Sequence, residues 1–209
     1  VILAHGDKNG LRIPPKIAPI QIVLIPIFRD EKQRKIIEDY IDPITKELKQ
    51  NEIRTFIDWS DSSPGYKFNE WELKGVPARI EIGPRDVENN KVEWARRDTL
   101  TKEITEREGL GARAAELLNT IQQDLYDRAL TRRGEMTSEV ETYDEFKEVL
   151  EQKGGFIYAH WDGTAETEER IKNETKATIR CIPLTEAIPG TCMVTGKASK
   201  QKVLFARAY

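Results

Sequence analysis

The apolar positions along the chain follow strand and helix periods in turn. A near-continuous apolar run at 21–28 is typical of a strand covered on both faces. After Asp30, which can cap a helix, apolar residues recur at helical spacing up to Leu48. Residues 53–59 are again rich in β-branched and aromatic side chains. Strand, crossover helix and strand predict a right-handed, parallel βαβ unit.

The pattern continues with shorter segments. Residues 60–66 have the composition of a loop, and 67–74 predict a short helix. A third strand is expected at 78–82, a turn at Pro84–Asn90, and a fourth strand at 91–97. We therefore expect an α/β fold, with a small mixed, largely parallel sheet flanked by helices.

A long amphipathic helix begins at Gly111 and loses its apolar stripe at 131–136, where we place a domain boundary. The segments after it predict a small α+β domain. Its expected helices and strands are 143–152 (helix), 156–161 (strand), 165–175 (helix), 177–184 (strand) and 202–209 (strand). The expected division is 1–19 (a short strand, a turn at Asp7–Gly10 and a connector), 20–135 (first domain) and 136–209 (second domain).

Composition narrows the class of protein. With 38% hydrophobic and 33% charged residues among 209, the chain suits a globular protein with an ordinary core. A formal net charge of −3 gives no global attraction to nucleic acid or membranes, so nucleic-acid contacts would have to be local. The longest apolar run, 20–28, is too short to span a bilayer, and no signal peptide is apparent. Two cysteines make no disulfide framework, which favours the cytoplasm.

Charges of both signs gather in the stretch 71–86, WELKGVPARIEIGPRD. Taken alone, they fit a solvated surface, because Arg79 and Glu81 alternate along a strand whose outer face can be wet. They also fit a site that recognises a polar ligand. The residues by themselves leave both interpretations open.

Three passages carry a resemblance to a known family. They are PGYKFNEWELKGVPARIEIGPRD followed by ARRD, then HGDKNGLRIPPKIAPIQIVLIPI, and the tail with ATIRCIP and VLFARAY. The first resembles the anticodon-binding domain of archaeal/eukaryotic-like prolyl-tRNA synthetases. The second resembles the passage that leaves the third class II motif of the catalytic core, and the third resembles the extra C-terminal domain. The chain also lacks an initiator Met, so we expect a C-terminal fragment of a longer enzyme.

The resemblance implies that the first domain reads an anticodon. A proline anticodon carries two guanines, whose acceptors suit Arg or Lys and whose N–H donors suit a carboxylate. Matching the family's pattern places the guanine-reading positions at Glu72, Arg79, Asp86 and Lys102. Glu72 and Asp86 would accept from base N–H groups, and the two cations would donate. Lys102 is the loosest match, since the loop before it differs in length.

The same resemblance implies the remaining chemistry and partners. The full-length protein would be a proline–tRNA ligase that uses ATP and Mg²⁺, binds tRNA(Pro) and dimerises through its catalytic core, without a membrane. The fragment would lack catalytic residues and cofactors and be inactive alone. Relatives hold zinc with four cysteines in the C-terminal domain. Here those positions are Asp162, Thr167, Cys192 and Thr195, which are not a zinc ligand set, so we expect no metal.

Other interpretations are weaker. A free RNA-binding accessory module without ligase activity is the main alternative, and histidyl-, threonyl- or glycyl-tRNA synthetases would share only the first domain's fold. No glycine-rich phosphate loop follows a strand, which disfavours a small nucleotide-binding enzyme. His5 and Asp7 resemble a catalytic pair but fit a structural turn better. His160 suits a packed residue, and Trp71 a wall of the base-reading pocket.

Overall fold

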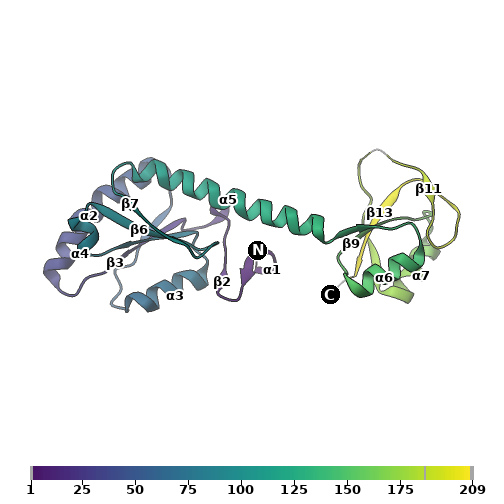
Figure 1. Cartoon of the computed structure of the whole chain (residues 1–209), viewed down its shortest axis with the longest axis horizontal. Helices are drawn as coiled ribbons and strands as arrows, with labels where there is room; N and C mark the ends of the chain where they lie inside the picture. Colours follow the sequence, from purple (N-terminus) through teal and green to yellow (C-terminus); the bar gives the residue numbers. More distant parts are fainter. Residues whose placement is uncertain (1, 186, 208–209) are drawn as a thin grey trace. The chain divides into compact units, whose positions relative to one another are not determined.

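The computed structural model describes residues 2–185 and 187–207, and it divides the chain into two compact units, Val1–Asp127 and Arg128–Tyr209 (Figure 1). The division falls inside the long helix α5 (Leu110–Glu135), before the boundary expected at 135/136. Helix α5 itself ends at Glu135, where the apolar stripe of the sequence ends. The helix therefore belongs partly to each unit.

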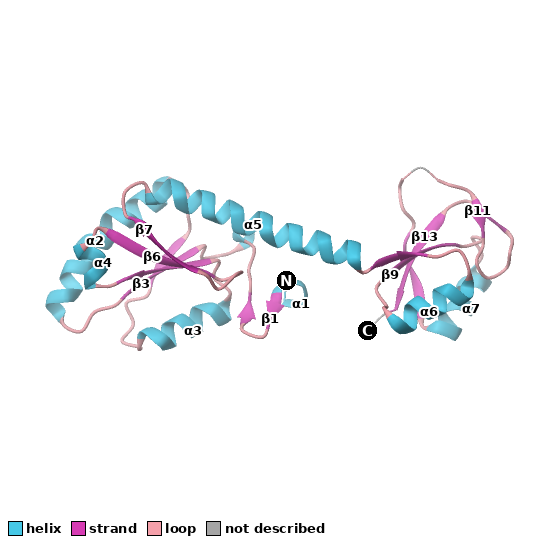
Figure 2. Ribbon diagram, in the orientation of Figure 1, coloured by secondary structure: helices cyan, strands magenta, loops and turns pink. Residues whose placement is uncertain are grey.

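The first unit is built on a five-stranded sheet with the order β4-β3-β5-β6-β7 (Figure 2). Its strands are β3 (Ile22–Pro26), β4 (Thr55–Ile57), β5 (Ala78–Ile82), β6 (Lys91–Arg96) and β7 (Lys102–Glu106). Strand β3 pairs in parallel with β4 and β5, whereas β5, β6 and β7 pair antiparallel. The mixed sheet and the parallel βαβ unit are confirmed. The sheet is less parallel than expected, because its second half is an antiparallel meander.

Helices cover the two faces of this sheet differently. Helix α2 (Glu31–Gln50) and the first half of α5 pack on one face, in a core that includes Ile22, Leu24 and Ile80. The N-cap prediction for α2 is confirmed, since Asp30 Oδ1 accepts a hydrogen bond from the Gln33 N–H at 2.8 Å. In the described part of the chain, α3 (Pro64–Lys74) packs on the β3 part of the opposite face and reaches β5, where the Phe68 ring lies 4.7 Å from Arg79 Cζ. That face opens toward β7, whose side chains are mostly exposed.

Several local expectations were wrong, for identifiable reasons. Residues 2–5 form a helical turn, α1 (Ile2–His5), and not a strand, because so short an apolar run has no period to distinguish the two. The turn expected at Pro84–Asn90 is the short helix α4 (Pro84–Glu88), and α3 begins at Pro64 instead of residue 67. Strand β7 was not predicted. It is a largely exposed edge strand of mixed polarity.

The N-terminal segment forms a small hairpin beside α3. Strands β1 (Gly6–Asp7) and β2 (Gly10–Leu11) pair through the turn that was predicted there, in which Asp7 Oδ1 accepts from the Asn9 N–H at 2.8 Å. The 3-10 helix η1 (Pro15–Ile17) follows and leads into β3. Helix α3 ends at Gly75, whose φ of 77° is left-handed.

Helix α5 changes character along its length. Its buried side chains lie between Leu110 and Leu125, where they close the core over the sheet. The residues from Tyr126 to Glu135 are all exposed. The second half of the helix therefore packs no side chain into either core.

The second unit is a small α+β domain, as predicted. Its main sheet has the order β10-β13-β9-β8, and a separate two-stranded ribbon joins β11 to β12. The elements are β8 (Thr137–Glu139), α6 (Tyr143–Gln152), β9 (Phe156–His160), α7 (Ala165–Thr175), β10 (Ala177–Cys181), β11 (Gly190–Thr191), β12 (Ala198–Ser199) and β13 (Lys202–Arg207). Phe146 and Phe205 meet edge to face in its core, with centroids 5.3 Å apart. The short strands β8, β11 and β12 were not predicted. The last two residues of the strand expected at 202–209 lie outside the described residues.

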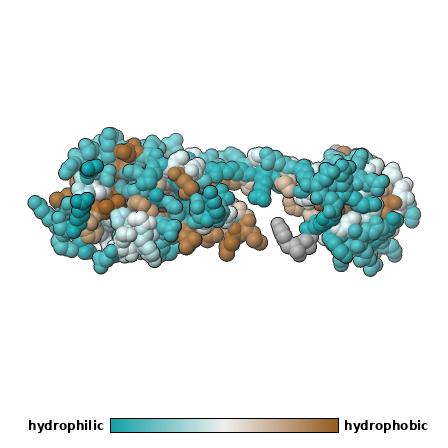
Figure 3. Space-filling model, turned by 60° about the horizontal axis from the view of Figure 1, so that its bottom comes forward, coloured by the Kyte–Doolittle hydropathy of each residue, from teal (hydrophilic) through white to brown (hydrophobic). Residues whose placement is uncertain are grey.

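The surface of the first unit carries a few exposed apolar residues, such as Ile2 and Leu3 at the N-terminal turn. The face drawn in Figure 3 is otherwise mostly hydrophilic, with isolated hydrophobic patches. Among the described residues, no helix combines the length and the apolar content that crossing a membrane requires.

Replacing Gly75 by Ala is expected to destabilise the first unit by about 2 kcal/mol or more. A left-handed φ costs a non-glycine residue roughly 1–2 kcal/mol, and the new Cβ would lie only 2.6 Å from Leu11 Cβ. Gly65→Ala, in the same helix, is the control, because no atom lies within 4 Å of its Cβ. It should leave the free energy of unfolding unchanged or raise it slightly. Urea unfolding of both variants would show the difference, and equal stabilities would contradict the prediction.

Candidate functional site

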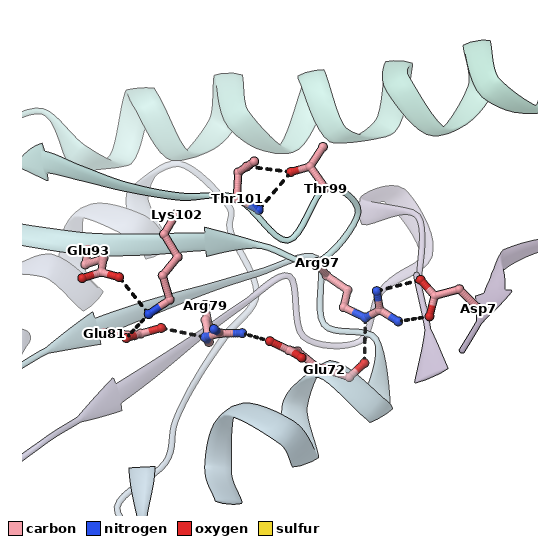
Figure 4. Close-up of polar contacts among 9 residues, drawn as sticks. All are labelled: Asp7, Glu72, Arg79, Glu81, Glu93, Arg97, Thr99, Thr101 and Lys102. Atoms are coloured by element: carbon pink, nitrogen blue, oxygen red, sulfur yellow. Dashed lines mark hydrogen bonds and ion pairs between the residues drawn. The ribbon is translucent and has the colours of Figure 1, made fainter. Parts of the chain in front are cut away.

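The open face of the antiparallel meander carries an ordered row of charged side chains (Figure 4). Residues of β5, β6 and β7 alternate between the core and this face, so that Glu81 lies opposite Glu93 and Lys102 lies opposite Ala95. Helix α3 borders the row and contributes Glu72. We call Glu72, Arg79, Glu81, Lys102 and Glu93 the charged row.

Each member of the charged row contacts the next. Arg79 Nη1 lies 2.5 Å from Glu72 Oε1, and Arg79 Nε lies 2.8 Å from Glu81 Oε1. The other oxygen of Glu81, Oε2, lies 2.9 Å from Lys102 Nζ, which also contacts Glu93 Oε1 at 2.8 Å. Negative and positive groups therefore alternate from one end to the other, and a carboxylate stands at each end.

Glu81 and Arg79 are the buried members of the charged row, and Lys102 is its most exposed member, at 43%. The side chain of Glu81 is 8% exposed and that of Arg79 11%, whereas the two end carboxylates, Glu72 and Glu93, are 26% and 29% exposed. A buried carboxylate needs paired cations, and Glu81 has one on each oxygen. The end carboxylates are the ones that a ligand can reach.

Two further contacts fix the cations of the row. The ring of Phe68, on α3, lies 4.7 Å from Arg79 Cζ and 5.3 Å from Lys102 Nζ, within the range of cation–π attraction. Burial lowers the pKa of Lys102, but its hydrogen bonds to Glu93 and Glu81 outweigh this, and the net pKa is raised. Both cations are therefore charged and positioned before any ligand arrives.

A buried arginine ties the site to the N-terminal hairpin. Arg97 binds both carboxylate oxygens of Asp7, at 2.6 and 3.0 Å, and donates to the backbone oxygen of Glu72 at 2.8 Å. Its side chain is only 2% exposed. The paired arginine holds the pKa of Asp7 down, to about 2. Because Asp7 is used in this way, it is a structural partner of Arg97, and the pairing of His5 with Asp7 as a catalytic dyad finds no support.

Asp86 is placed differently from the other residues expected at the site. Its Oδ2 accepts the Gly83 N–H at 2.7 Å and so caps the short helix α4. Helix α4 lies against α2, and Val87 packs on the core there, on the other side of the sheet. Among the described residues, no contact joins Asp86 to the charged row. The structure therefore brings together Glu72, Arg79 and Lys102, but not Asp86.

Sequence reasoning missed three members of the site, Glu81, Glu93 and Phe68. The signal for Glu81 was its position two residues after Arg79 on one strand, which puts both side chains on one face. Glu93 could not be linked to them without the register of β5 with β6. Trp71 is buried and its indole N–H donates to Asp58 Oδ2 at 2.8 Å, and it lines a small hollow together with Glu72 and Arg79.

Three of the four positions matched to a zinc site in the second unit meet at Asp162. Its Oδ2 accepts hydrogen bonds from the hydroxyls of Thr167 and Thr195, both at 2.9 Å, and its Oδ1 accepts from Thr164. Cys192 is buried in the turn that carries Thr195. One thiol and one carboxylate whose oxygens are already engaged do not fit a tetrahedral zinc centre. In the part of the chain that the structure describes, no group of three His, Cys, Asp or Glu residues could hold a metal.

His160 is packed, as the sequence indicated. It is 6% exposed, and its Nδ1 lies 3.1 Å from the Ser199 hydroxyl.

The charged row can bind a molecule that presents donors and acceptors side by side. Carboxylates accept from N–H groups and cations donate to carbonyl oxygens, so the row suits an object with alternating polar edges better than a simple anion or cation. The edges of unpaired nucleobases have this character.

Comparison with known proteins assigns both units. Residues 21–117 match the family model of an anticodon binding domain, and 143–209 match that of the prolyl-tRNA synthetase C-terminal domain. The chain is 56% identical to a proline–tRNA ligase of Porphyromonas gingivalis strain W83, 53% to that of Cytophaga hutchinsonii and 51% to that of Flavobacterium johnsoniae. Each alignment covers 100% of this chain and 43% of the relative, so the chain spans less than half the length of these proteins.

Acid should detach Asp7 from Arg97 only at very low pH. Since the pKa of Asp7 is lowered in the folded protein to about 2, the contact stabilises the fold at neutral pH and is lost as pH falls from about 4 through 2. Arg97→Gln should raise the pKa of Asp7, whereas Arg170→Gln, on an exposed helix of the other unit, should not. An NMR titration of the Asp7 carboxyl measures this. A value near 4 in the unaltered protein would refute the assignment.

Asp162→Ala is expected to destabilise the second unit by about 2 kcal/mol, because three threonine side chains lose a charged acceptor. Asp144→Ala is the control, since that side chain is 98% exposed. The pKa of Asp162 is lowered, because the hydrogen bonds from the threonines outweigh the opposing effect of burial. The contribution of Asp162 should therefore fade as pH falls below about 4. Thermal melts of the two variants test the prediction, and equal melting temperatures would contradict it.

We also expect protein purified without chelator to contain no stoichiometric zinc. EDTA should leave its melting temperature unchanged, because the residues around Asp162 are joined by hydrogen bonds and do not make a zinc ligand set. Elemental analysis with one zinc per chain, or a melt lowered by EDTA, would show the prediction to be wrong.

Proposed function

The chain belongs to the prolyl-tRNA synthetase family, of which it carries the anticodon-binding and C-terminal domains, and from this premise we propose that the charged row reads the anticodon guanines of tRNA(Pro). An anticodon-binding domain binds tRNA. The proposal goes further: the tRNA is tRNA(Pro), the bases are its anticodon guanines, and the side chains are those of the charged row. The observation that carries it is the alternation of carboxylates and cations along the charged row.

Guanine suits this alternation. Its O6 accepts a hydrogen bond, and its neighbouring N1–H and N2–H groups donate, so one edge of the base needs a cation beside a carboxylate. Arg79 with Glu72 provides such a pair at the border of α3. A base with the opposite pattern, such as adenine, would place an acceptor against the carboxylate and leave a buried charge unpaired.

The site is arranged before the RNA arrives. Arg79 is held by Glu81 and by the ring of Phe68, so little side-chain freedom is lost on binding. The RNA would replace contacts that the row makes with itself. Replacing contacts within the row by contacts with RNA adds little affinity. It adds selectivity, because a wrong base would break an ion pair of the row without forming good hydrogen bonds in its place.

The activity of the whole protein is part of the same proposal. The relatives are named proline–tRNA ligases, and we propose that the full-length protein attaches proline to tRNA with ATP and Mg²⁺, as a homodimer in the cytoplasm. In that setting the chain described here supplies tRNA binding. We expect it to show no proline-dependent pyrophosphate exchange alone.

Arg79→Gln is expected to weaken binding of an RNA hairpin that carries the two anticodon guanines by about tenfold or more, since a good base contact is worth about 1–3 kcal/mol. Affinity for a hairpin with two adenines in their place should hardly change. Arg170→Gln removes the same charge from an exposed pair with Glu174 and is the control. Fluorescence anisotropy at fixed salt measures all combinations.

If the unaltered chain binds both hairpins equally, it does not read the guanines. If Arg79→Gln keeps the full preference for the guanine hairpin, other residues of the domain recognise the guanines.

A further inference from the structure

We infer that Arg97 is a positioning residue for guanine recognition: it fixes the backbone of Glu72 against the N-terminal hairpin, so that Asp7 contributes to the choice of base without touching it. The proposed function, on which this rests, makes Glu72 one of the base-reading side chains. Arg97 is too deeply buried to contact RNA, since its side chain is 2% exposed. Figure 4 shows it between Asp7 and Glu72.

The guanidinium of Arg97 holds two separate segments at once. Its Nη1 and Nη2 donate to the two carboxylate oxygens of Asp7, on β1, and its Nε donates to the backbone oxygen of Glu72, on α3. A guanidinium presents its donors in a rigid plane, so the two acceptors are fixed relative to each other. Arg97 itself is anchored to the sheet, because its backbone N–H donates at 2.9 Å to the oxygen of Pro77, the residue before β5.

The hairpin also packs directly on the last turn of α3. Just after the hairpin, the Ile13 N–H donates at 3.1 Å to the backbone oxygen of Gly75, the residue at which the helix ends. A Cβ at Gly10 would lie 2.6 Å from Leu73 Cα, so the two backbones meet there with no side chain between them. The position of the hairpin therefore fixes the end of α3 that carries Glu72.

The carboxylate of Glu72 depends on its backbone for its position. Within the charged row it contacts only Arg79, through Oε1, and its side chain is 26% exposed. Glu72 lies in the last turn of a helix, where backbone carbonyls lack the usual helical partners. Its carbonyl accepts from the Gly75 N–H and from Arg97. If the latter contact is lost, the carboxylate can shift, and hydrogen bonds to a base weaken steeply with poor geometry.

The neighbouring arginine provides a matched control. Arg96 is also paired with a carboxylate through two nitrogens, since its Nε and Nη2 contact Asp98 at 3.0 and 2.8 Å. It further contacts Asp124, on α5, and so serves the covered face of the sheet. Among the described residues, no recorded contact joins Arg96 to the charged row. Its loss should therefore loosen the fold without moving Glu72.

The test uses the RNA hairpin with the two anticodon guanines (guanine RNA) and the one with two adenines in their place (adenine RNA). Fluorescence anisotropy at fixed salt gives the ratio of the two affinities. This ratio does not depend on how much of the chain is folded, because an unfolded fraction lowers both apparent affinities alike. A merely structural role of Arg97 would therefore leave the ratio unchanged.

We expect Asp7→Asn and Arg97→Lys each to lower this ratio about fivefold, and Arg96→Lys to leave it unchanged. Lysine keeps the charge of Arg97, but it lacks the planar fork that holds both acceptors at once. Asp7→Asn combined with Arg97→Lys should lower the ratio no further than Arg97→Lys alone, because both changes break the same contact.

A second measurement begins with the unaltered chain. Saturating guanine RNA should shift the backbone amide resonances of Asn9 and Gly10, in the turn of the N-terminal hairpin, because coupling between two sites is reciprocal. Arg97→Lys should abolish this shift at the same saturation, and Arg96→Lys should keep it.

A ratio that stays unchanged in both Asp7→Asn and Arg97→Lys overturns the inference. So does an equal loss in Arg96→Lys, which would show general loosening, or an amide shift that persists in Arg97→Lys. In each of these cases the loss of guanine preference in Arg79→Gln would leave the proposed function standing. If the unaltered chain does not distinguish the two RNAs, the proposed function fails, and the role of Arg97 fails with it.

Discussion

One buried carboxylate organises the open face of the first unit. Glu81 is nearly enclosed, and a charge so placed is tolerable only because Arg79 and Lys102 neutralise it from both sides. Those cations in turn draw Glu72 and Glu93 toward them, so the whole charged row follows from the burial of a single acid. The row spans a helix and three strands, and it can form only if β5, β6 and β7 hold their register. The charged row therefore depends directly on the register of the sheet.

The contrast between the two faces of the sheet shows how the fold creates this site. One face is filled by α2 and α5, and its residues form the core. The other is covered by α3 over β3 and part of β5, so the exposure of outward side chains rises across the antiparallel meander toward β7. A polar network on the covered face would be costly, because every group would need an internal partner. On the open face, water or a ligand can supply the hydrogen-bond partners that the polar network lacks.

Much of this could be predicted from the sequence, and the exceptions have physical causes. The βαβ unit, its N-cap at Asp30 and the second domain's helices followed from hydrophobic period and capping chemistry, which are local. The family's pattern identified Glu72, Arg79 and Lys102, which the structure brings together. The place of Glu93 depends on the register of β5 with β6, which is tertiary structure and which no window of sequence contains. The place of Asp86 is set locally, because its carboxylate accepts the Gly83 N–H three residues away in a helix cap.

The exposed second half of α5 has a consequence for how the molecule unfolds. From Tyr126 to Glu135 the helix buries no side chain, so only its own backbone hydrogen bonds hold it in shape, and those are weak without a packed face. Each hydrophobic core is made from side chains of one unit, on either side of this stretch. Cooperativity in proteins is transmitted by packing, and here no buried side chain carries it along the chain from one core to the other. This stretch of α5 therefore does not couple the melting of one core to that of the other.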